Sequence, residues 1–407
     1  MTRTGVVVVG AGQAGLAVSH LLAGRGIDHV VLERGRAAQA WAAHRWESLR
    51  LLTPNWMSRL PGRTYDRADP DGFMSAGEVA GYLTDYARPL PVVQGAQVLS
   101  VRRRDRGYRV ESTAGSWVAP VVVVATGACQ QPNVPRIAGG LHPSVRQLTP
   151  DRYRNPDSVP DGEVLVVGAG ATGVQLADEL SAAGRDVVLA VGRHSRMPRR
   201  YRDRDIMWWL DAMGTLHRPL DQSRRRPAPS LQLRADRPLD LDALAGRGVR
   251  LAGRLDAVHG RFASFVDDLT ATAAEADARQ QRLLTMIDSF AAATGVDAPA
   301  EPHPRPTPTT AAPGRLAVRT LIWATGYRRN YPWLHVPVLD RTGEITQVDG
   351  ATPAPGLFVV GLPNQTRRSS TFLDGVRFDA ELVVDAAARH LSTAAGRLSG
   401  AIERRAS

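Results

Sequence analysis

Two glycine-rich loops contain the residues whose types and spacing could do chemistry. Gly10, Gly12 and Gly15 follow four consecutive valines in GxGxxG spacing, which is typical of a turn between a buried strand and a helix. The first glycine permits the turn, the second lets the backbone approach a pyrophosphate, and the third lets the helix pack closely on the strand. Free backbone N–H groups at the start of the helix would then bind the anion. The expected chemistry is dinucleotide binding.

An acidic residue stands where such a site needs one. The sequence predicts a second strand over residues 29–32, and Glu33 follows it directly. A carboxylate at this point can accept hydrogen bonds from ribose hydroxyls, and it repels a 2′-phosphate. Three glycines alone also arise from ordinary turn chemistry, but strand, glycines, helix, strand and acid in this order are far more specific. We expect an adenine dinucleotide without a 2′-phosphate at the first loop.

The second loop repeats the pattern with one difference. Gly168, Gly170 and Gly173 follow an apolar strand, and a further strand is predicted over residues 187–191. No carboxylate ends that strand, and basic and hydroxyl side chains follow it instead: Arg193, Ser195, Arg196, Arg199 and Arg200. Guanidinium groups match phosphate geometry, so this loop should prefer a 2′-phosphorylated nucleotide, with Arg199 and Arg200 converging on the region of Arg193. A solvated basic loop is the alternative, although it would not explain the missing acid.

The two loops together indicate a reaction class. An acid at one site and arginines at the other most simply mean FAD at the first loop and NADPH at the second. Hydride would pass from the nicotinamide to the flavin, and the reduced flavin would pass electrons onward, while the protein supplies position and electrostatics.

Composition limits the other classes of function. The chain has 407 residues, enough for two domains, and its 51 basic residues are all arginine, with a formal net charge of +11. The arginines are scattered and lack the aromatic interleaving of a nucleic-acid groove. Cys129 is the single cysteine, so we expect no disulfide framework, no CxxC pair and no metal site. The apolar runs are too short to span a bilayer, and we expect a cytoplasmic protein.

The elements around the loops alternate as in an α/β protein. A helix is predicted over residues 75–86, because Ser75 and Glu78 form a capping box pattern. A long helix is predicted over residues 264–294, and residues 299–314 form a proline-rich connector. Trp41, Trp46 and Trp56 lie in the irregular segment after the first loop, where they could wall a planar ring or simply cover the core. The remaining predicted strands span residues 92–101, 108–112, 116–118, 121–124, 164–167, 316–323 and 357–360, and a closing helix follows.

The order of the motifs resembles a known family. GAGQAGL, HRWESLRLLTPNW, ATGACQQPNVP, VVGAGATGVQLADEL, ATGY and RRSSTFLDGV succeed one another along nearly the whole chain. They resemble the flavin-containing monooxygenase superfamily, most of all its CzcO-type bacterial FAD/NAD(P)-binding oxidoreductases. The resemblance implies two Rossmann-like doubly wound domains, with the NADPH domain inserted into the FAD domain. The implied division is 1–156 for the first part of the FAD domain, 157–326 for the NADPH domain with its helical insertion, and 327–407 for the C-terminal part of the FAD domain.

The resemblance also implies an activity and site residues. In that family, reduced FAD forms a C4a-(hydro)peroxide with oxygen while NADP⁺ stays bound, and the peroxide oxygenates a small molecule. No catalytic side chain is identified. The residues implied for FAD are Gly10, Gly12, Gly15, Glu33, Trp41, Arg45, Trp46, Thr126, Gly127 and Gly361, and those for NADPH are Gly168, Gly170, Gly173, Arg193, Arg200, Thr325 and Gly326.

One stretch departs from the family pattern. The fingerprint FxGxxxHxxxY corresponds to GGLHPSVRQLTPDRY, in which Tyr153 takes the tyrosine position and Thr149 stands in place of the histidine. This departure leaves open how domain closure couples to peroxide stabilisation, and it makes Baeyer–Villiger chemistry a less expected activity.

The leading hypothesis is therefore an NADPH- and FAD-dependent monooxygenase. Its partners would be a small-molecule substrate and molecular oxygen, with no nucleic acid or membrane, and a homodimer is left open. One alternative is an NADPH:acceptor reductase or oxidase that inserts no oxygen. Another is a redox-sensing regulatory flavoprotein linked to ion transport. A dithiol-based disulfide reductase is excluded because one thiol cannot form the redox pair.

Overall fold

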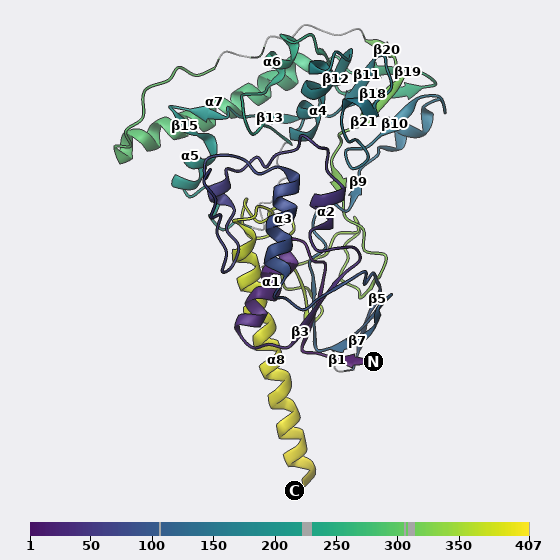
Figure 1. The fold of residues 1–407 in the computed structure, drawn as a ribbon, viewed down its shortest axis with the longest axis vertical. Coiled ribbons are helices and arrows are strands. Elements are labelled where there is room, and N and C mark those ends of the chain that lie inside the picture. Colours follow the sequence, from purple (N-terminus) through teal and green to yellow (C-terminus); the bar gives the residue numbers. More distant parts are fainter. Residues whose placement is uncertain (106, 222–229, 305–306, 308–313, 407) are drawn as a thin grey trace.

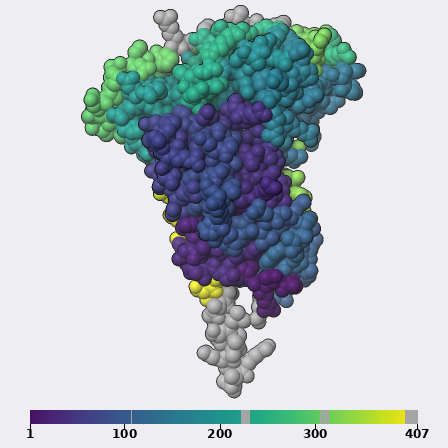
Figure 2. Space-filling model, in the orientation of Figure 1, coloured from purple at the N-terminus to yellow at the C-terminus, as the bar shows by residue number. Residues whose placement is uncertain are grey.

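The protein consists of two lobes stacked along its long axis. The computed structural model describes residues 1–105, 107–221, 230–304, 307 and 314–406. Figure 2 shows the lower lobe, formed on this face mostly by N-terminal residues in purple and blue, beneath a broader upper lobe in teal and green. The long C-terminal helix α8 (Val376–Ala406) runs down the lower lobe and extends beyond it (Figure 1).

The lower lobe is built on a five-stranded parallel sheet. Its strand order is β24-β8-β2-β3-β4, so β2 is central and the chain order reverses beside it. Three of these strands are pure or nearly pure runs of apolar residues that are fully buried, as a sheet covered on both faces requires. The strands are β2 (Val6–Val9), β3 (His29–Glu33), β4 (Val92–Gln94), β8 (Val121–Val124) and β24 (Leu357–Val359).

Helices cover one face of this sheet and a second sheet covers the other. α1 (Gln13–Gly24), α3 (Ala76–Ala87) and α8 share a core with one set of the valines. The alternate valines, which point to the other face of the parallel sheet, pack on a mixed sheet of order β1-β7-β6-β5-β23. Its strands are β1 (Thr2–Arg3), β5 (Val98–Arg104), β6 (Gly107–Ser112), β7 (Gly115–Ala119) and β23 (Leu334–His335).

One predicted strand is two strands that belong to different sheets. Residues 92–101 divide into β4, in the parallel sheet, and β5, in the mixed sheet. Gly95 lies between them with a φ of +70°, a left-handed conformation that breaks an extended chain. The capping box at the start of α3 is confirmed, since the Ser75 hydroxyl accepts from the N–H of Glu78 and the Glu78 carboxylate accepts from the N–H of Ser75.

The upper lobe repeats the parallel sheet. Its order is β10-β21-β11-β12-β17, and β11 takes the place that β2 has below. β10 joins this sheet although it precedes residue 157, where the sequence-based division starts the second domain. The strands are β10 (Arg146–Leu148), β11 (Val164–Val167), β12 (Val187–Ala190), β17 (Arg250–Ala252) and β21 (Thr320–Trp323). Two Rossmann-like sheets therefore confirm the predicted α/β fold class.

Helices and a small sheet complete the upper core. α4 (Ala171–Ala182) and α6 (Leu241–Ala245) pack on one face of the sheet. The other face is covered by β18 (Leu255–His259), β19 (Phe262–Phe265) and β20 (Arg315–Ala317). The predicted helix over residues 264–294 begins later than expected, because residues 262–265 form β19 and α7 spans Leu269–Thr294.

An insertion after β12 forms the rest of the upper lobe. β13 (His194–Arg196) pairs with β16 (Ser230–Gln232), and the hairpin of β14 (Arg200–Tyr201) and β15 (Arg204–Asp205) leads into α5 (Ile206–Ala212). α5 and α7 pack in an apolar cluster that also contains Met57, from the segment between α1 and α3. Part of the predicted proline-rich connector, residues 305–306 and 308–313, lies outside the described residues.

Two antiparallel linkers join the lobes. β9 (Gln131–Pro132) leads upward and pairs with β22 (Tyr327–Arg328), which leads back down, and β9 lies at the junction in Figure 1. The short elements α2 (Gln39–Ala43), η1 (Asn55–Met57), η2 (Arg136–Gly140) and η3 (Pro156–Ser158) lie in connecting segments. In the part of the chain that the structure describes, no helix is both long and apolar enough to cross a membrane.

Candidate nucleotide sites

The first glycine loop lies at the carboxyl end of β2, where the order of the lower parallel sheet reverses. Gly10 has a φ of +107°, and a Cβ there would lie 2.8 Å from the carbonyl oxygen of Ala125. A Cβ on Gly15 would lie 1.9 Å from the carbonyl oxygen of Gly10, so α1 can pack on the turn only because residue 15 lacks a side chain.

Gly12 leaves the start of α1 open. It is the N-cap residue, it makes no side-chain cap, and the first turn carries no acidic residue. Apart from its chain neighbours, no heavy atom of the described residues lies within 4 Å of the position that a Cβ on Gly12 would take. Uncapped N–H groups beside open space suit a phosphate group, which the positive end of the helix also attracts.

Glu33 lies directly beside this loop. Its Oε2 accepts a hydrogen bond of 2.8 Å from the N–H of Ala11, and its Oε1 accepts one of 2.9 Å from the N–H of Gly35. A cavity of about 730 Å³ adjoins this end of β3, and it is lined by Arg34, Gly35, Arg36, Gln39, His44, Gln94 and Gly95. The acid and the cavity lie where the ribose and adenine of a dinucleotide would extend from the loop.

The structure gathers three more of the sequence-predicted residues around the start of α1. Gly361 has a φ of +82°, and a Cβ there would lie 2.8 Å from the Cβ of Ala14. Gln130 Nε2 donates to the Thr126 hydroxyl over 2.8 Å and to the carbonyl oxygen of Gly127 over 3.1 Å. The ends of β8 and β24 lie beside the first loop, since a Cβ on Gly10 would lie 3.4 Å from the Cα of Thr126.

The second glycine loop reproduces this geometry. Gly168 has a φ of +106°, and a Cβ there would lie 2.6 Å from the carbonyl oxygen of Ala324. A Cβ on Gly173 would lie 1.7 Å from the carbonyl oxygen of Gly168. Gly170 is the N-cap residue of α4, and no side chain caps this helix start. The residues present at both loops thus fit a dinucleotide, because each loop has a helix start without a side-chain cap and the same two close contacts.

The arginines after β12 divide into an exposed and a buried pair. Arg193 and Arg200 are exposed. Arg196, only 8% exposed, forms ion pairs of 2.8 Å with both Asp240 and Asp277, and Arg199, 3% exposed, pairs with Asp205 and donates to Leu52. Arg196 and Arg199 therefore stabilise the upper lobe. Contrary to the sequence-based expectation, Arg199 is held by Asp205 and does not stand free beside Arg193.

The predicted site residues in the segment after the first loop lie in different lobes. The Arg45 guanidinium lies 5.1 Å from the ring centre of Trp41, which packs against the core of the lower lobe. Trp46 instead lies in the core of the upper lobe with Tyr153. Arg154 donates to the carbonyl oxygen of Arg45 over 2.8 Å, so this segment also ties the lobes together.

Tyr153 forms part of that upper core, and Thr149 precedes it by one turn. The carbonyl oxygen of Thr149 accepts from the N–H of Tyr153 over 3.0 Å. Tyr153 is fully buried, and burial together with the neighbouring Glu179 raises the pKa of its hydroxyl. Burial also raises the pKa of Glu179. Tyr153, the tyrosine of the FxGxxxHxxxY pattern, is thus buried in the upper core and keeps its hydroxyl proton.

Thr325 and Gly326 lie at the linkers. The Thr325 hydroxyl donates to the carbonyl oxygen of Asn133, and the N–H of Asn133 donates to the carbonyl oxygen of Gly326 over 2.9 Å. Gln130, which binds Thr126 and Gly127, also accepts from the N–H of Asn330 over 3.0 Å. The first site is therefore hydrogen-bonded directly to the linker that returns from the upper lobe.

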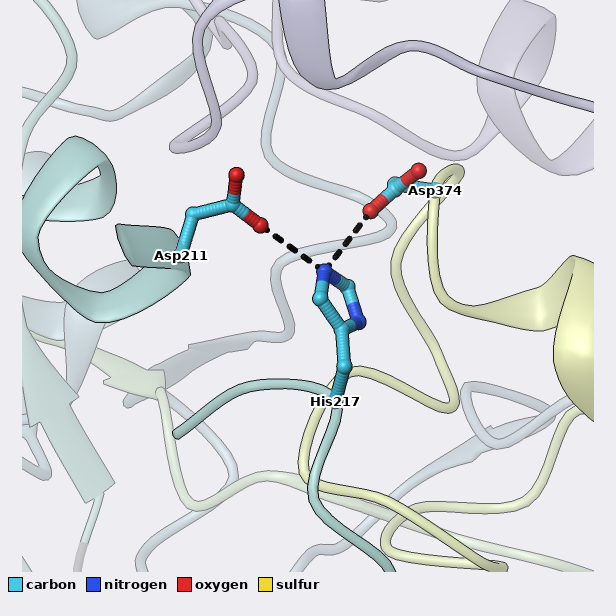
Figure 3. Close-up of side chains that lie close together, drawn as sticks. All are labelled: Asp211, His217 and Asp374. Carbon is cyan, nitrogen blue, oxygen red and sulfur yellow. Dashed lines mark hydrogen bonds and ion pairs between the residues drawn. The ribbon is translucent and has the colours of Figure 1, made fainter. Parts of the chain in front are cut away.

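Sequence reasoning missed a loop over the first site. Gln13, the first residue of α1, donates from Nε2 to the carbonyl oxygen of Thr371 over 2.7 Å. The loop of residues 366–375 that contains Thr371 matches the motif RRSSTFLDGV, but the motif did not indicate which of its residues would lie at the site. Asp374 of this loop meets His217 and Asp211 of the upper lobe (Figure 3).

Asp211, His217 and Asp374 resemble a metal site in composition only. Their potential ligand atoms lie within 4.8 Å of one another. However, Arg59 binds both oxygens of Asp374, at 2.7 and 3.0 Å, and Arg377 lies 3.2 Å from it. Two guanidinium groups already balance the two carboxylates, so a divalent cation would add unbalanced positive charge. The cluster is an ion-pair network.

Comparison with known proteins places the chain in a family. A family model described as pyridine nucleotide-disulphide oxidoreductase matches residues 7–213, more than half of the 407 residues. The chain belongs to this family. Both glycine loops lie within the matched region, and the match confirms that the protein is an oxidoreductase enzyme.

Three similar proteins agree with the resemblance to CzcO-type oxidoreductases and flavin-containing monooxygenases. An uncharacterized CzcO-like oxidoreductase of Geobacillus kaustophilus is 32% identical over 394 residues, covering 95% of this chain and 98% of the relative. Indole-3-pyruvate monooxygenase YUCCA4 of rice is 33% identical over 197 residues, covering 43% of this chain and 44% of the relative. A flavin-containing monooxygenase from Stenotrophomonas maltophilia has a TM-score of 0.71 at 20% identity, covering 96% of this chain and 99% of that structure. The CzcO-type resemblance is confirmed, and the last likeness confirms the fold.

Proposed function

We propose that this oxidoreductase is an NADPH- and FAD-dependent monooxygenase of a small molecule. One observation carries the proposal: opposite charges stand at or just after the ends of the two equivalent strands β3 and β12. Glu33 ends β3 and is hydrogen-bonded to the first glycine loop, and Arg193, three residues after the end of β12, is exposed. An acid favours a free ribose and an arginine favours a ribose phosphate, so the two loops are suited to different nucleotides.

The first loop is the proposed FAD site. Gly10, Gly12 and Gly15 would hold the pyrophosphate, and Glu33 would accept from the adenosine ribose. Trp41, Arg45, Thr126, Gly127 and Gly361 are the further residues proposed for this site, whereas Trp46 packs in the core of the upper lobe. The open space beside Gly12 and the uncapped start of α1 support it, as does the hydrogen bond from Ala11 that orients the Glu33 carboxylate.

The second loop is the proposed NADPH site. Gly168, Gly170 and Gly173 would hold the pyrophosphate, and Arg193 would bind the 2′-phosphate. Arg200, Thr325 and Gly326 are the further residues proposed here. Arg193 is better placed for this role than Arg196 or Arg199, because the latter two already bind carboxylates. The proposed division of the chain is 1–156, 157–326 and 327–407, except that β10 before residue 157 belongs to the sheet of the second domain.

The proposed reaction follows from the two nucleotides. NADPH supplies two electrons, oxygen supplies the atom inserted into the substrate, and the second oxygen atom leaves as water with the proton balance closed by one solvent proton. Bound FAD would supply the oxygen activation through its C4a-(hydro)peroxide. Names of relatives that include monooxygenase, such as the rice YUCCA4 enzyme and the Stenotrophomonas protein, support this reaction class.

Rapid mixing of the reduced protein with oxygen tests the proposal. The holoprotein is first reduced by one equivalent of NADPH and then mixed with oxygenated buffer while the flavin spectrum is followed. A long-lived C4a adduct is expected before the oxidised spectrum returns. Immediate return to oxidised flavin with stoichiometric hydrogen peroxide would instead assign a reductase or oxidase. Failure of NADPH to reduce the bound flavin would reject both assignments.

A further inference from the structure

A segment of the upper lobe runs beside the loop that is hydrogen-bonded to the start of α1 at the first nucleotide site. The N–H of Leu220 donates to the carbonyl oxygen of Thr366 over 2.8 Å, and Arg367 Nε donates to the carbonyl oxygen of His217 over 2.9 Å. The carbonyl oxygen of Leu216 accepts from both the N–H and the hydroxyl of Ser369, at 3.2 and 2.9 Å. These bonds join the chain just after α5 to the loop of residues 366–375.

The loop itself is held tightly over the start of α1. Its Thr371 carbonyl oxygen accepts from Gln13, which follows Gly12 directly. A Cβ on Gly375 would lie 1.9 Å from the carbonyl oxygen of Ser369, so the loop closes on itself before α8 begins at Val376. Phe372 packs against the apolar cluster that α5 and α7 form. A shift of this loop would therefore move a direct neighbour of the first site.

His217 connects the loop to α5 directly, beside Arg59, which binds Asp374 and lies 3.9 Å from Asp211. Its Nε2 lies 2.9 Å from Asp211 Oδ1 and 3.1 Å from Asp374 Oδ2, and its Nδ1 lies 3.1 Å from the Ser369 hydroxyl (Figure 3). The carboxylates can only accept from Nε2, so His217 bridges two carboxylates from different lobes.

Burial makes this bridge strong. The Asp374 side chain is fully buried, whereas His217 is 21% and Asp211 is 29% exposed. A hydrogen bond to a carboxylate is stronger than one between two neutral groups, and a buried carboxylate that loses a partner keeps its desolvation cost. Arg59 and Arg377 hold Asp374 from the lower lobe and α8, whereas His217 pairs with it from the upper lobe.

We propose that His217 is a positioning residue for the flavin site. It fixes the loop of residues 366–375 against α5, and through this loop it sets the geometry between the flavin at the first loop and the nicotinamide that the upper lobe delivers. The inference rests on the proposed function, because it assigns the two nucleotides to the two lobes. His217 itself touches neither glycine loop, so its removal should leave nucleotide affinity intact while hydride transfer becomes slower.

The test uses FAD-loaded full-length protein and three variants. H217A removes all three contacts, whereas H217Q keeps an amide that can donate to both carboxylates. H303A is the matched control. His303 is 26% exposed, lies 2.9 Å from Asp288 on α7 and also bonds to Gln281, so it occupies a comparable bridge in the same lobe without contact to residues 366–375.

Two measurements are made below the melting temperature of every variant. Stopped-flow reduction by NADPH gives the rate constant of flavin reduction and the dissociation constant of NADPH. Hydrogen exchange of the Ser369 and Phe372 amides reports the loop without reference to activity, since both amides are hydrogen-bonded within or beside the loop. In H217A the reduction rate should fall roughly ten- to a hundredfold, as expected for a misplacement of about 1 Å, with little change in NADPH affinity. Exchange at the two amides should accelerate by about tenfold or more.

The control variants decide between positioning and general destabilisation. H217Q should recover most of the reduction rate, and H303A should lose thermal stability without changing either measurement. The inference is overturned if wild-type flavin is reduced by NADPH but H217A is reduced at the same rate, or if H303A slows reduction equally. If NADPH does not reduce wild-type flavin, the proposed function fails first and the inference fails with it.

Discussion

Glu33 is hydrogen-bonded to the glycine loop whose ligand it is expected to recognise. The N–H of Ala11 donates to Glu33 Oε2 over 2.8 Å, so the end of β3 is attached to the turn between Gly10 and Gly12. The second Glu33 oxygen binds the N–H of Gly35. The carboxylate is therefore oriented before any ribose binds, which reduces the entropy that binding must overcome.

E33A tests this orientation. The substitution removes the acceptor for both backbone N–H groups and for the ribose, so FAD should dissociate roughly ten- to a hundredfold more readily, the factor that a lost charged hydrogen bond predicts. E33Q keeps an oxygen acceptor and should lose less. Flavin content after dialysis and titration of the apoprotein with FAD measure the effect. Equal FAD affinity in E33A and the wild type would argue against a ribose contact.

Gly12 and Gly15 should respond differently to the same change. A Cβ on Gly12 meets open space, whereas one on Gly15 would lie 1.9 Å from the carbonyl oxygen of Gly10. G12A should therefore keep the melting temperature of the apoprotein and abolish FAD retention, because the methyl group intrudes only on the pyrophosphate. G15A should lower the melting temperature itself. A yellow, fully loaded G12A protein would contradict the placement of the pyrophosphate.

The sequence predicted the structure where the residues of one short segment are themselves the physical cause of its conformation. Gly10, Gly15, Gly168 and Gly173 each avoid a backbone collision, and this need appears as fixed spacing in the chain. The buried valine strands likewise follow from apolar runs of the right length. Both Rossmann-like sheets and both glycine loops could therefore be predicted.

The contacts between lobes could not be predicted in this way. Arg59, His217 and Asp374 meet from three distant segments, and each residue type is ordinary in its local sequence. Trp46 lies close to the first loop in sequence but packs in the upper core, because the chain passes between the lobes at that point. Tertiary packing determines these positions, and the local sequence around each residue does not predict which distant residues it will contact.

C129S tests the reaction class against the family description. Cys129 is exposed in the segment before β9, and no second cysteine exists in the chain. A dithiol-dependent reduction would need a pair of thiols, so the proposed monooxygenase should keep its rate of substrate-coupled NADPH oxidation in C129S. Oxygen uptake and NADPH oxidation measure this together. Loss of coupled turnover in C129S would favour thiol chemistry.

His194 should make the upper lobe sensitive to mild acid. It is almost fully buried after β12, and burial lowers the pKa of its imidazole below the ordinary value of about 6.5. The native state therefore keeps His194 neutral, while the unfolded state takes up a proton as pH falls through that value. Stability is present above about pH 6.5 and decreases below it, by up to about 1.4 kcal/mol per pH unit. Melting temperatures measured from pH 7.5 to 5.5 should fall less steeply in H194N, which can still donate to Gly192, than in the wild type or in the exposed control H142N.

Arg193 should determine which pyridine nucleotide reduces the protein. It is exposed three residues after the end of β12, whereas Arg196, three residues further on, is buried between Asp240 and Asp277. A charged hydrogen bond to phosphate contributes about 1.5–3 kcal/mol, so R193A should weaken NADPH roughly ten- to a hundredfold and leave NADH nearly unchanged. R196A is the matched control, because it removes the same charge but breaks two buried ion pairs. It should lower the melting temperature and keep the preference for NADPH. Stopped-flow reduction with each nucleotide measures both affinities. If R193A slowed reduction by NADPH and NADH equally, or if the wild type already preferred NADH, the arginine would be a solvated surface residue and the second loop would not be an NADPH site.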